Sequence, residues 1–299
     1  MKKLILKLVT VTICSLTIAL SFFCLDPSHR IFAQEPDIMT YEEYRRIKHK
    51  QPYILDLESG RGRLLYFGVK HVKNLNDPQI AEIEKRWAKF RPTLILSESG
   101  VRAVESSREK AIERYGEAGL LSFLAAKHNI RIKSIDPPRL DEIAHLLSTK
   151  RWTGEQIKLF FILRRVAENA KRPKPQPVDA FVKEGLKALS TVSGLEGAPA
   201  TLSEFEESVR RVLPSVPDWK QIQTTVFDPN PTLGLYTNDV AYASSQYRDR
   251  YMVKLLAEEV KKGERVFAVV GASHVVMQER ALRKALKQAS LSSNAAPNK

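Results

Sequence analysis

The chain has 299 residues, of which 43% are hydrophobic, so it can bury a sizeable core in one large domain or two small ones. The formal net charge is +14, but the basic residues mostly alternate with glutamates on predicted helix faces, for example over 82–86. A nucleic-acid interface would gather Lys and Arg with aromatic residues in one stripe, so we expect no nucleic-acid partner and only weak association with anionic membrane surfaces.

The first 33 residues predict a signal peptide. Three lysines precede an apolar run from Leu8 to Leu25, and Ala33 supplies the small residue that a signal peptidase requires. We therefore expect an exported protein, periplasmic or secreted, whose mature part starts near Gln34. The apolar run just reaches the length of a membrane span, so an uncleaved N-terminal membrane anchor is the alternative.

Both cysteines, Cys14 and Cys24, lie in this leader. Phe23 is bulky where a lipoprotein signal has a small residue before its cysteine, so we do not expect lipidation. Residues 34–299 contain no thiol, which excludes a disulfide, a cysteine nucleophile and a thiolate-bound metal from the mature protein.

Strands and helices alternate in the first half of the mature sequence. A short helix is expected over 41–50, and the apolar stretch Arg63–Gly68 predicts a buried strand. Asp77 as N-cap and Pro78 as first helical residue begin an amphipathic helix that ends before Pro92.

Two further strands, Thr93–Ser97 and Ile130–Ile135, flank a helical stretch over about Glu117–Lys127. Because strands that alternate with helices are joined by right-handed crossovers, we expect an α/β fold with a mainly parallel central sheet flanked by helices.

Residues from about 140 to 238 have helical periodicity that is broken by stretches rich in proline or glycine over 171–177 and 194–200. We interpret this segment as a helical insertion without a second core, inside a single domain over 34–299. A long helix from Val240 to Lys262 then follows.

The strand Arg265–Gly271 and a last helix, from about Val276 to Gln288, complete the predicted elements, and the tail from Ser290 is expected to be frayed.

Two segments share one pattern of a basic residue, an apolar strand, G-x-x-H and an amphipathic helix. His71 lies three residues after Gly68, and His274 three residues after Gly271. In parallel α/β sheets, ligands bind beyond the carboxyl ends of the strands, where both histidines are expected. A neutral imidazole there suits a divalent metal or general-base catalysis, whereas a loop histidine that caps the next helix is the structural alternative.

Carboxylates follow the other predicted strands. Glu98 stands directly after one strand and would complete a His/His/Glu set, although it could also cap the next helix. Asp136 stands at the end of another strand, and we expect it to support the site or the local structure.

Arg248 and Asp249 are expected at the start of the helix that carries Met252. An arginine there opposes the helix dipole, so we expect it to bind a substrate carboxylate or to orient Glu98. The alternative is that Arg248 lies on the surface and pairs with Asp249. If Arg248 belongs to the site, we expect Asp249 to support the site as well.

These motifs, in their order along the chain, resemble the pattern of the TraB/TIKI superfamily, which includes erythromycin-esterase-like and ChaN-like relatives. The resemblance covers about 63–98 and 242–286, and it is carried by Tyr66-Phe-Gly-Val-Lys-His71, Asn76-Asp-Pro-Gln79, Glu98, Tyr247-Arg-Asp-Arg-Tyr-Met252 and Val269-Val-Gly-Ala-Ser-His274. Val69 stands where the family usually has threonine, and Asp249 where it often has asparagine.

The resemblance implies three chemistries. TIKI-like members are metal-dependent peptidases, erythromycin-esterase-like members are hydrolases in which a histidine activates water without a metal, and ChaN-like members bind haem.

The leading hypothesis is a hydrolase of a peptide or another small molecule, in which His71, Glu98 and His274 bind one divalent metal and Arg248 binds or polarises the substrate. Mn or Co is the metal that the family implies, and the ligand set also suits Zn or Fe(II). A metal-free esterase-like hydrolase with a histidine base is the first alternative, and an exported haem-binding protein is the second.

Overall fold

The computed structural model describes residues 37–98, 100–172 and 174–294, with side chains as far as Lys287. The predicted signal peptide over 1–33 lies outside the described residues. We find no candidate membrane-spanning helix within the described ranges.

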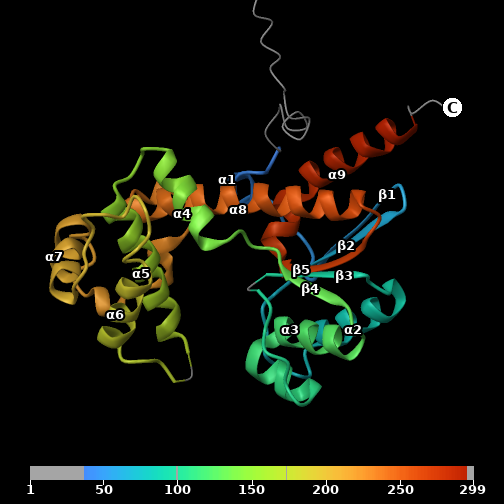
Figure 1. Cartoon of the computed structure of the whole chain (residues 1–299), viewed down its shortest axis with the longest axis horizontal. Coiled ribbons are helices and arrows are strands. Elements are labelled where there is room, and N and C mark those ends of the chain that lie inside the picture. Colours follow the sequence, from blue (N-terminus) through green and yellow to red (C-terminus); the bar gives the residue numbers. More distant parts are fainter. Residues whose placement is uncertain (1–36, 99, 173, 295–299) are drawn as a thin grey trace, which may run out of the picture. The chain divides into compact units, whose positions relative to one another are not determined.

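The described residues form a five-stranded sheet in the order β1-β2-β5-β3-β4 (Figure 1). β1 runs antiparallel to β2, and every other neighbouring pair is parallel. The predicted α/β fold with a mainly parallel sheet is therefore confirmed. The strands are β1 (Tyr53–Ser59), β2 (Gly62–Val69), β3 (Leu94–Ser97), β4 (Arg131–Ser134) and β5 (Arg265–Gly271).

Helices cover both faces of the sheet (Figure 1). The alternation of side chains along β2 directs Leu64 and Tyr66 to one face and Leu65 and Phe67 to the other. The first face packs against α8 (Tyr236–Lys261) and α9 (Ala272–Asn294), and the second against α2 (Pro78–Phe90) and α3 (Arg108–Lys127). As predicted, α2 has Asp77 as its N-cap, and the side chain of Asp77 accepts from the Gln79 N–H.

Between β4 and β5, every regular element among the described residues is a helix. The elements are α4 (Arg139–Ser148), α5 (Gly154–Ala170), α6 (Val178–Ala188), α7 (Leu202–Val212), η2 (Trp219–Gln221), η3 (Thr224–Phe227), η4 (Pro231–Leu233) and α8. They enclose a separate apolar cluster that includes Phe160, Leu163, Phe205 and Trp219. The prediction that this segment lacks its own core is wrong, because its short amphipathic helices bury their apolar faces mainly against one another.

Several element boundaries differ from the prediction. α1 is limited to Tyr41–Arg45, and α9 begins directly after β5 and extends to Asn294, into the tail that was expected to be frayed from Ser290. α8 begins at Tyr236, so Arg248 and Asp249 lie in its middle and the argument from the helix dipole does not apply to them.

Candidate functional site

Three neighbouring strands end at the candidate site. β2, β5 and β3 lie side by side and run parallel, so their carboxyl ends share one sheet edge. His71 lies two residues beyond β2, Glu98 directly follows β3, and His274 lies in the first turn of α9. The two G-x-x-H segments meet at one sheet edge as predicted, but the second is a helix start instead of a loop.

Gly68 allows the two segments to approach each other. A Cβ atom at Gly68 would lie 2.8 Å from the Cα of Ala272 and 2.9 Å from the backbone oxygen of Tyr53. Such contacts are shorter than real Cβ atoms tolerate. The glycine of the first segment therefore makes room for the helix turn that carries His274.

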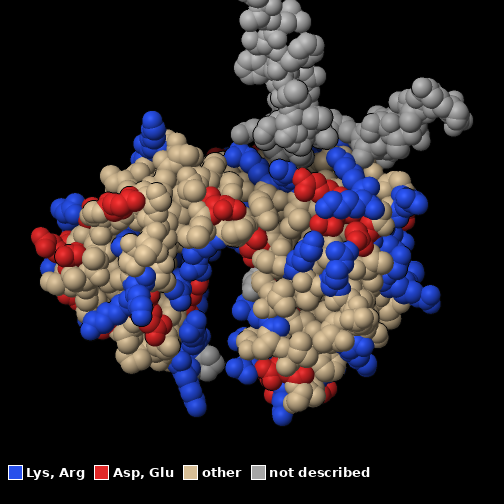
Figure 2. Space-filling view, viewed as in Figure 1, with Lys and Arg blue, Asp and Glu red and all other residues tan. Residues whose placement is uncertain are grey.

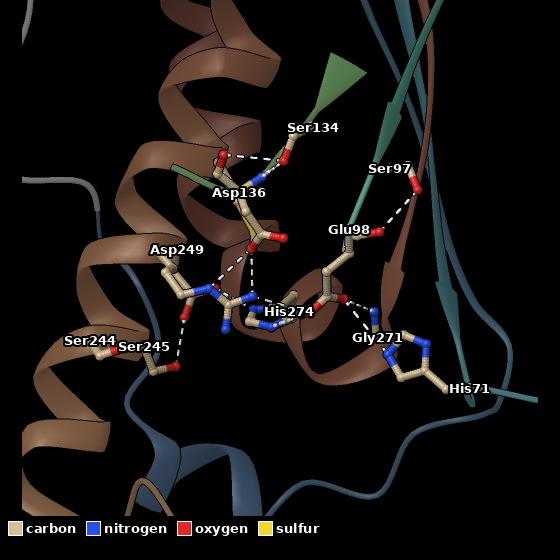
Figure 3. Close-up of polar contacts among 12 residues, drawn as sticks. His71, Ser97, Glu98, Ser134, Asp136, Ser244, Ser245, Asp249, Gly271 and His274 are labelled. Atoms are coloured by element: carbon tan, nitrogen blue, oxygen red, sulfur yellow. Dashed lines mark hydrogen bonds and ion pairs between the residues drawn. The ribbon is translucent and has the colours of Figure 1, made fainter. Parts of the chain in front are cut away.

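The Glu98 carboxylate lies between the two imidazoles (Figure 3). Its Oε2 is 3.8 Å from Nε2 of His71, and its Oε1 is 3.5 Å from Nε2 of His274. The backbone N–H of Gly271 donates to Oε2 at 2.7 Å. Burial alone would raise the pKa of Glu98, but His274, Arg248 and the Gly271 amide hold it well below its usual range, so the group is an anion.

His274 has a side chain that is only 13% exposed, and Asp249 on α8 fixes its orientation. Its Nδ1 is 2.6 Å from Oδ1 of Asp249, which is fully buried and also accepts from Nε2 of Gln278 at 2.6 Å. Burial would lower the pKa of His274, but the carboxylates of Asp249 and Glu98 raise it to about 10. Asp249 therefore directs Nε2 of this imidazole toward Glu98.

His71 is more accessible, with 56% of its side chain exposed, and it pairs with a carboxylate that the sequence analysis missed. Its Nδ1 contacts Oε1 of Glu117 on α3, and this hydrogen bond raises the pKa of His71 although burial opposes the shift. The other oxygen of Glu117 accepts from the Val72 N–H at 3.4 Å. Each imidazole thus has Nδ1 on a carboxylate and Nε2 toward Glu98.

A break in α3 brings Glu117 to His71. Gly116 has φ 63° and ψ −144° inside the helix, and a Cβ there would lie 2.4 Å from the backbone oxygen of Val72. Only glycine fits this position. A glutamate directly after a glycine, in an otherwise apolar helical stretch, is the signal that could have identified Glu117.

Arg248 connects two carboxylates from separate strand ends. Its Nη2 donates to Asp136 Oδ1 at 2.5 Å and to Glu98 Oε1 at 3.2 Å, and its Nε donates to Asp136 Oδ1 at 3.0 Å. Burial would lower the pKa of Arg248, but Asp136 and Glu98 outweigh that effect and raise it. The position matches the expected task of orienting Glu98, and Asp136 supports the arginine.

A cleft of about 900 Å³ opens in front of these residues and includes His71, Glu98, Asp136 and Arg248 in its lining. α5 contributes another part of the lining, and Figure 2 shows the hollow with Lys and Arg along its sides. The volume is typical of small-molecule sites. His274 instead lines a smaller neighbouring cavity of about 150 Å³, which Arg248 also borders.

The other described histidines have different surroundings. His49 contacts Tyr44, His128 follows the end of α3 beside Trp87, and His145 stacks on Tyr247. None of these three histidines lines the cleft of His71 or the smaller cavity of His274.

Among the described residues, no group of three or more His, Cys, Asp or Glu side chains meets the geometry of a metal site. The chain was also compared with family models, with curated proteins and with solved structures, and none of them matched.

Proposed function

We propose that the chain is a metal-dependent hydrolase of the TraB/TIKI type, in which His71, Glu98 and His274 bind one divalent ion. One observation carries the proposal: both imidazoles direct Nε2 to the same carboxylate, at 3.8 and 3.5 Å, while each Nδ1 pairs with another carboxylate. Metal-ligating histidines usually have their second nitrogen fixed in this way.

The donor types suit a divalent ion, although the three side chains as they stand do not meet the geometry of a metal site. Metal–nitrogen and metal–oxygen bonds of about 2.0–2.2 Å allow two ligand atoms on one ion to lie up to about 4 Å apart, and both nitrogen-to-oxygen distances are within that span. Two imidazoles and one carboxylate suit Zn, and Mn or Co is what the family resemblance implies. An ion bound there would lower the pKa of a water molecule and polarise a scissile carbonyl.

The remaining residues orient and enclose this set. Glu117 and Asp249 fix the two imidazole rings, and Arg248, supported by Asp136, keeps Glu98 ionised and in place. Arg248 also borders the cleft, where we propose that it contacts the substrate. We further propose that the helices between β4 and β5 are an insertion in the α/β domain, since α5 forms part of the cleft lining.

A metal-free hydrolase is the second candidate, and the Glu117–His71 pair favours it. Nδ1 of His71 contacts the carboxylate of Glu117, and the His71 side chain is half-exposed and lines the cleft. A general base must be within reach of the substrate, and His71 meets this requirement. In this alternative His274, with a pKa of about 10, is an imidazolium that stabilises Glu98.

Elemental analysis of protein purified without chelators tests the proposal, together with a screen of peptide and ester hydrolysis before and after chelation. We expect about one Mn, Co or Zn per chain, and activity that chelation removes and the same ion restores. Hydrolysis that survives complete metal removal would instead establish the metal-free alternative.

A further inference from the structure

Four arginines in the lining of the cleft have no ion pair with a carboxylate among the described residues. They are Arg102, Arg139, Arg165 and Arg172. Two other arginines of the lining are paired, because Arg248 contacts Asp136 and Glu98 and Nε of Arg164 lies 3.4 Å from Oε1 of Glu168. The cleft therefore presents more positive charge than its own carboxylates neutralise.

These arginines come from separate parts of the fold. Arg139 begins α4, just after the end of β4, while Arg165 lies on α5 and Arg172 lies two residues beyond its end. On α5, Phe161, Arg165 and Glu168 follow helical spacing and all line the cleft. Positive charge therefore faces the hollow from the sheet edge and from α5 (Figure 2).

Aromatic contacts hold two of these cations in position. The guanidinium of Arg165 lies 4.8 Å from the ring centre of Phe181, and that of Arg172 lies 5.8 Å from the same centre. Partial burial lowers the pKa of Arg165, and the neighbouring cations of Arg139 and Arg172 lower it further, although Glu168 opposes them. Like charges held together in a concave site are relieved by a bound anion.

We propose that Arg139, Arg165 and Arg172 form a binding site for the multiply charged oxyanion of a substrate, of the phosphate type, whose scissile bond reaches Glu98 and His71 in the same cleft. Planar guanidinium groups match phosphate oxygens in bidentate geometry, and three of them suit a group with more than one negative charge. That the anion belongs to a substrate rests on the proposed hydrolase function, whereas the anion site itself does not.

Titration calorimetry with inorganic tripolyphosphate tests the site, on protein freed of metal so that the probe cannot bind through an ion. We expect saturable binding of one tripolyphosphate per chain, weakened about tenfold by Arg139→Gln and by Arg172→Gln, and by more in the double variant. Arg151→Gln is the matched control, because Arg151 is an exposed arginine that stacks on an aromatic ring, Trp152, outside the cleft lining.

Glu98→Gln separates the anion site from the proposed catalytic function. Glu98→Gln should retain tripolyphosphate binding even though it should not hydrolyse any substrate, so loss of hydrolysis alone leaves the anion site intact. Equal binding by Arg139→Gln, Arg172→Gln and Arg151→Gln would overturn the proposed site. If citrate binds as tightly as tripolyphosphate, the proposed phosphate-type ligand is wrong and the site binds polycarboxylates. If an oligonucleotide binds more tightly than either anion, the proposal of a small substrate is wrong.

Discussion

Gly271 of the second G-x-x-H segment makes room for His71 of the first, since a Cβ atom at Gly271 would lie 3.3 Å from Nε2 of His71. The same Cβ would lie 3.7 Å from Oε2 of Glu98. Conversely, Gly68 of the first segment makes room for Ala272 of the second, in the helix turn that carries His274. Each glycine therefore faces the other segment at close range: Gly68 leaves no room for a Cβ atom, and a Cβ atom at Gly271 would crowd His71.

Gly271→Ala should impair the site more than the fold. The added methyl group contacts His71 but no backbone atom closely, so we expect an unfolding free energy within about 1 kcal/mol of wild type and a loss of about tenfold or more in metal affinity or hydrolysis. Gly68→Ala is the matched comparison, because its methyl group would meet backbone, and we expect it to cost about 2 kcal/mol or more. Urea denaturation and metal content measure both effects.

His71→Ala and His274→Ala should each abolish metal retention or hydrolysis, because a site with three protein ligands has no spare one. Their costs in stability should differ. His71 is half-exposed, so its replacement should change the free energy of unfolding little. Replacement of His274 leaves the buried carboxylate of Asp249 without its imidazole partner, so we expect His274→Ala to lower the free energy of unfolding by about 2–4 kcal/mol. His128→Ala, outside the site, should alter neither metal content nor hydrolysis, and wild-type behaviour of both site variants would refute the site.

Glu98→Gln preserves the shape of the side chain and removes its charge. If a metal is bound, its affinity should fall by more than about tenfold, because a carboxylate ligand is lost. If the hydrolase is metal-free, substrate binding should survive while turnover falls. Metal titration and the separate measurement of kcat and KM distinguish these outcomes, and unchanged values of all three would exclude Glu98 from the chemistry.

Glu117→Gln tests the carboxylate that fixes His71. Residues that orient a ligating or catalytic histidine typically contribute about 10–100-fold in metal affinity or activity, and we expect a loss in that range. Glu113→Gln, at an exposed position of the same helix, should have no effect. A pH profile of hydrolysis that is identical in wild type and Glu117→Gln would argue against an orienting role.

The mature N-terminus is expected near Gln34, since basic, apolar and small residues follow one another in the order of a signal peptide. N-terminal sequencing of protein from the periplasm or medium checks this position. An intact Met1 on membrane-bound protein would establish the uncleaved anchor, and an intact Met1 on soluble cytosolic protein would rule out export.

Much of the sheet could be predicted because β2, β3 and β5 are continuous apolar runs, as expected of strands buried on both faces. β1 alternates apolar and charged residues, as in Asp56 and Glu58, and lacks that signal. The strand order was not predictable, because nothing local to β5 indicates that it pairs with β2 and β3.

The candidate site also has residues that could be predicted from the sequence and residues that could not. His71, Glu98 and His274 could be identified because each follows a recognisable strand. Glu117 was not identified, because it reaches the site only through the break at Gly116, and helical periodicity alone does not reveal that break. Arg248 contacts Asp136, which is more than a hundred residues away in the sequence. Hydrophobic periodicity does not reveal contacts over such a separation.

β5 is the last strand in the sequence, yet it lies between β2 and β3. During synthesis, β2 and β3 emerge long before the strand that joins them, so the centre of the sheet stays incomplete until about residue 271 is available. Pairing over such a sequence separation is slow and leaves strand edges open to aggregation. A chain truncated before β5 would lack Gly271 and His274 together with the strand that unites the sheet, so the same segment completes both the sheet and the candidate site.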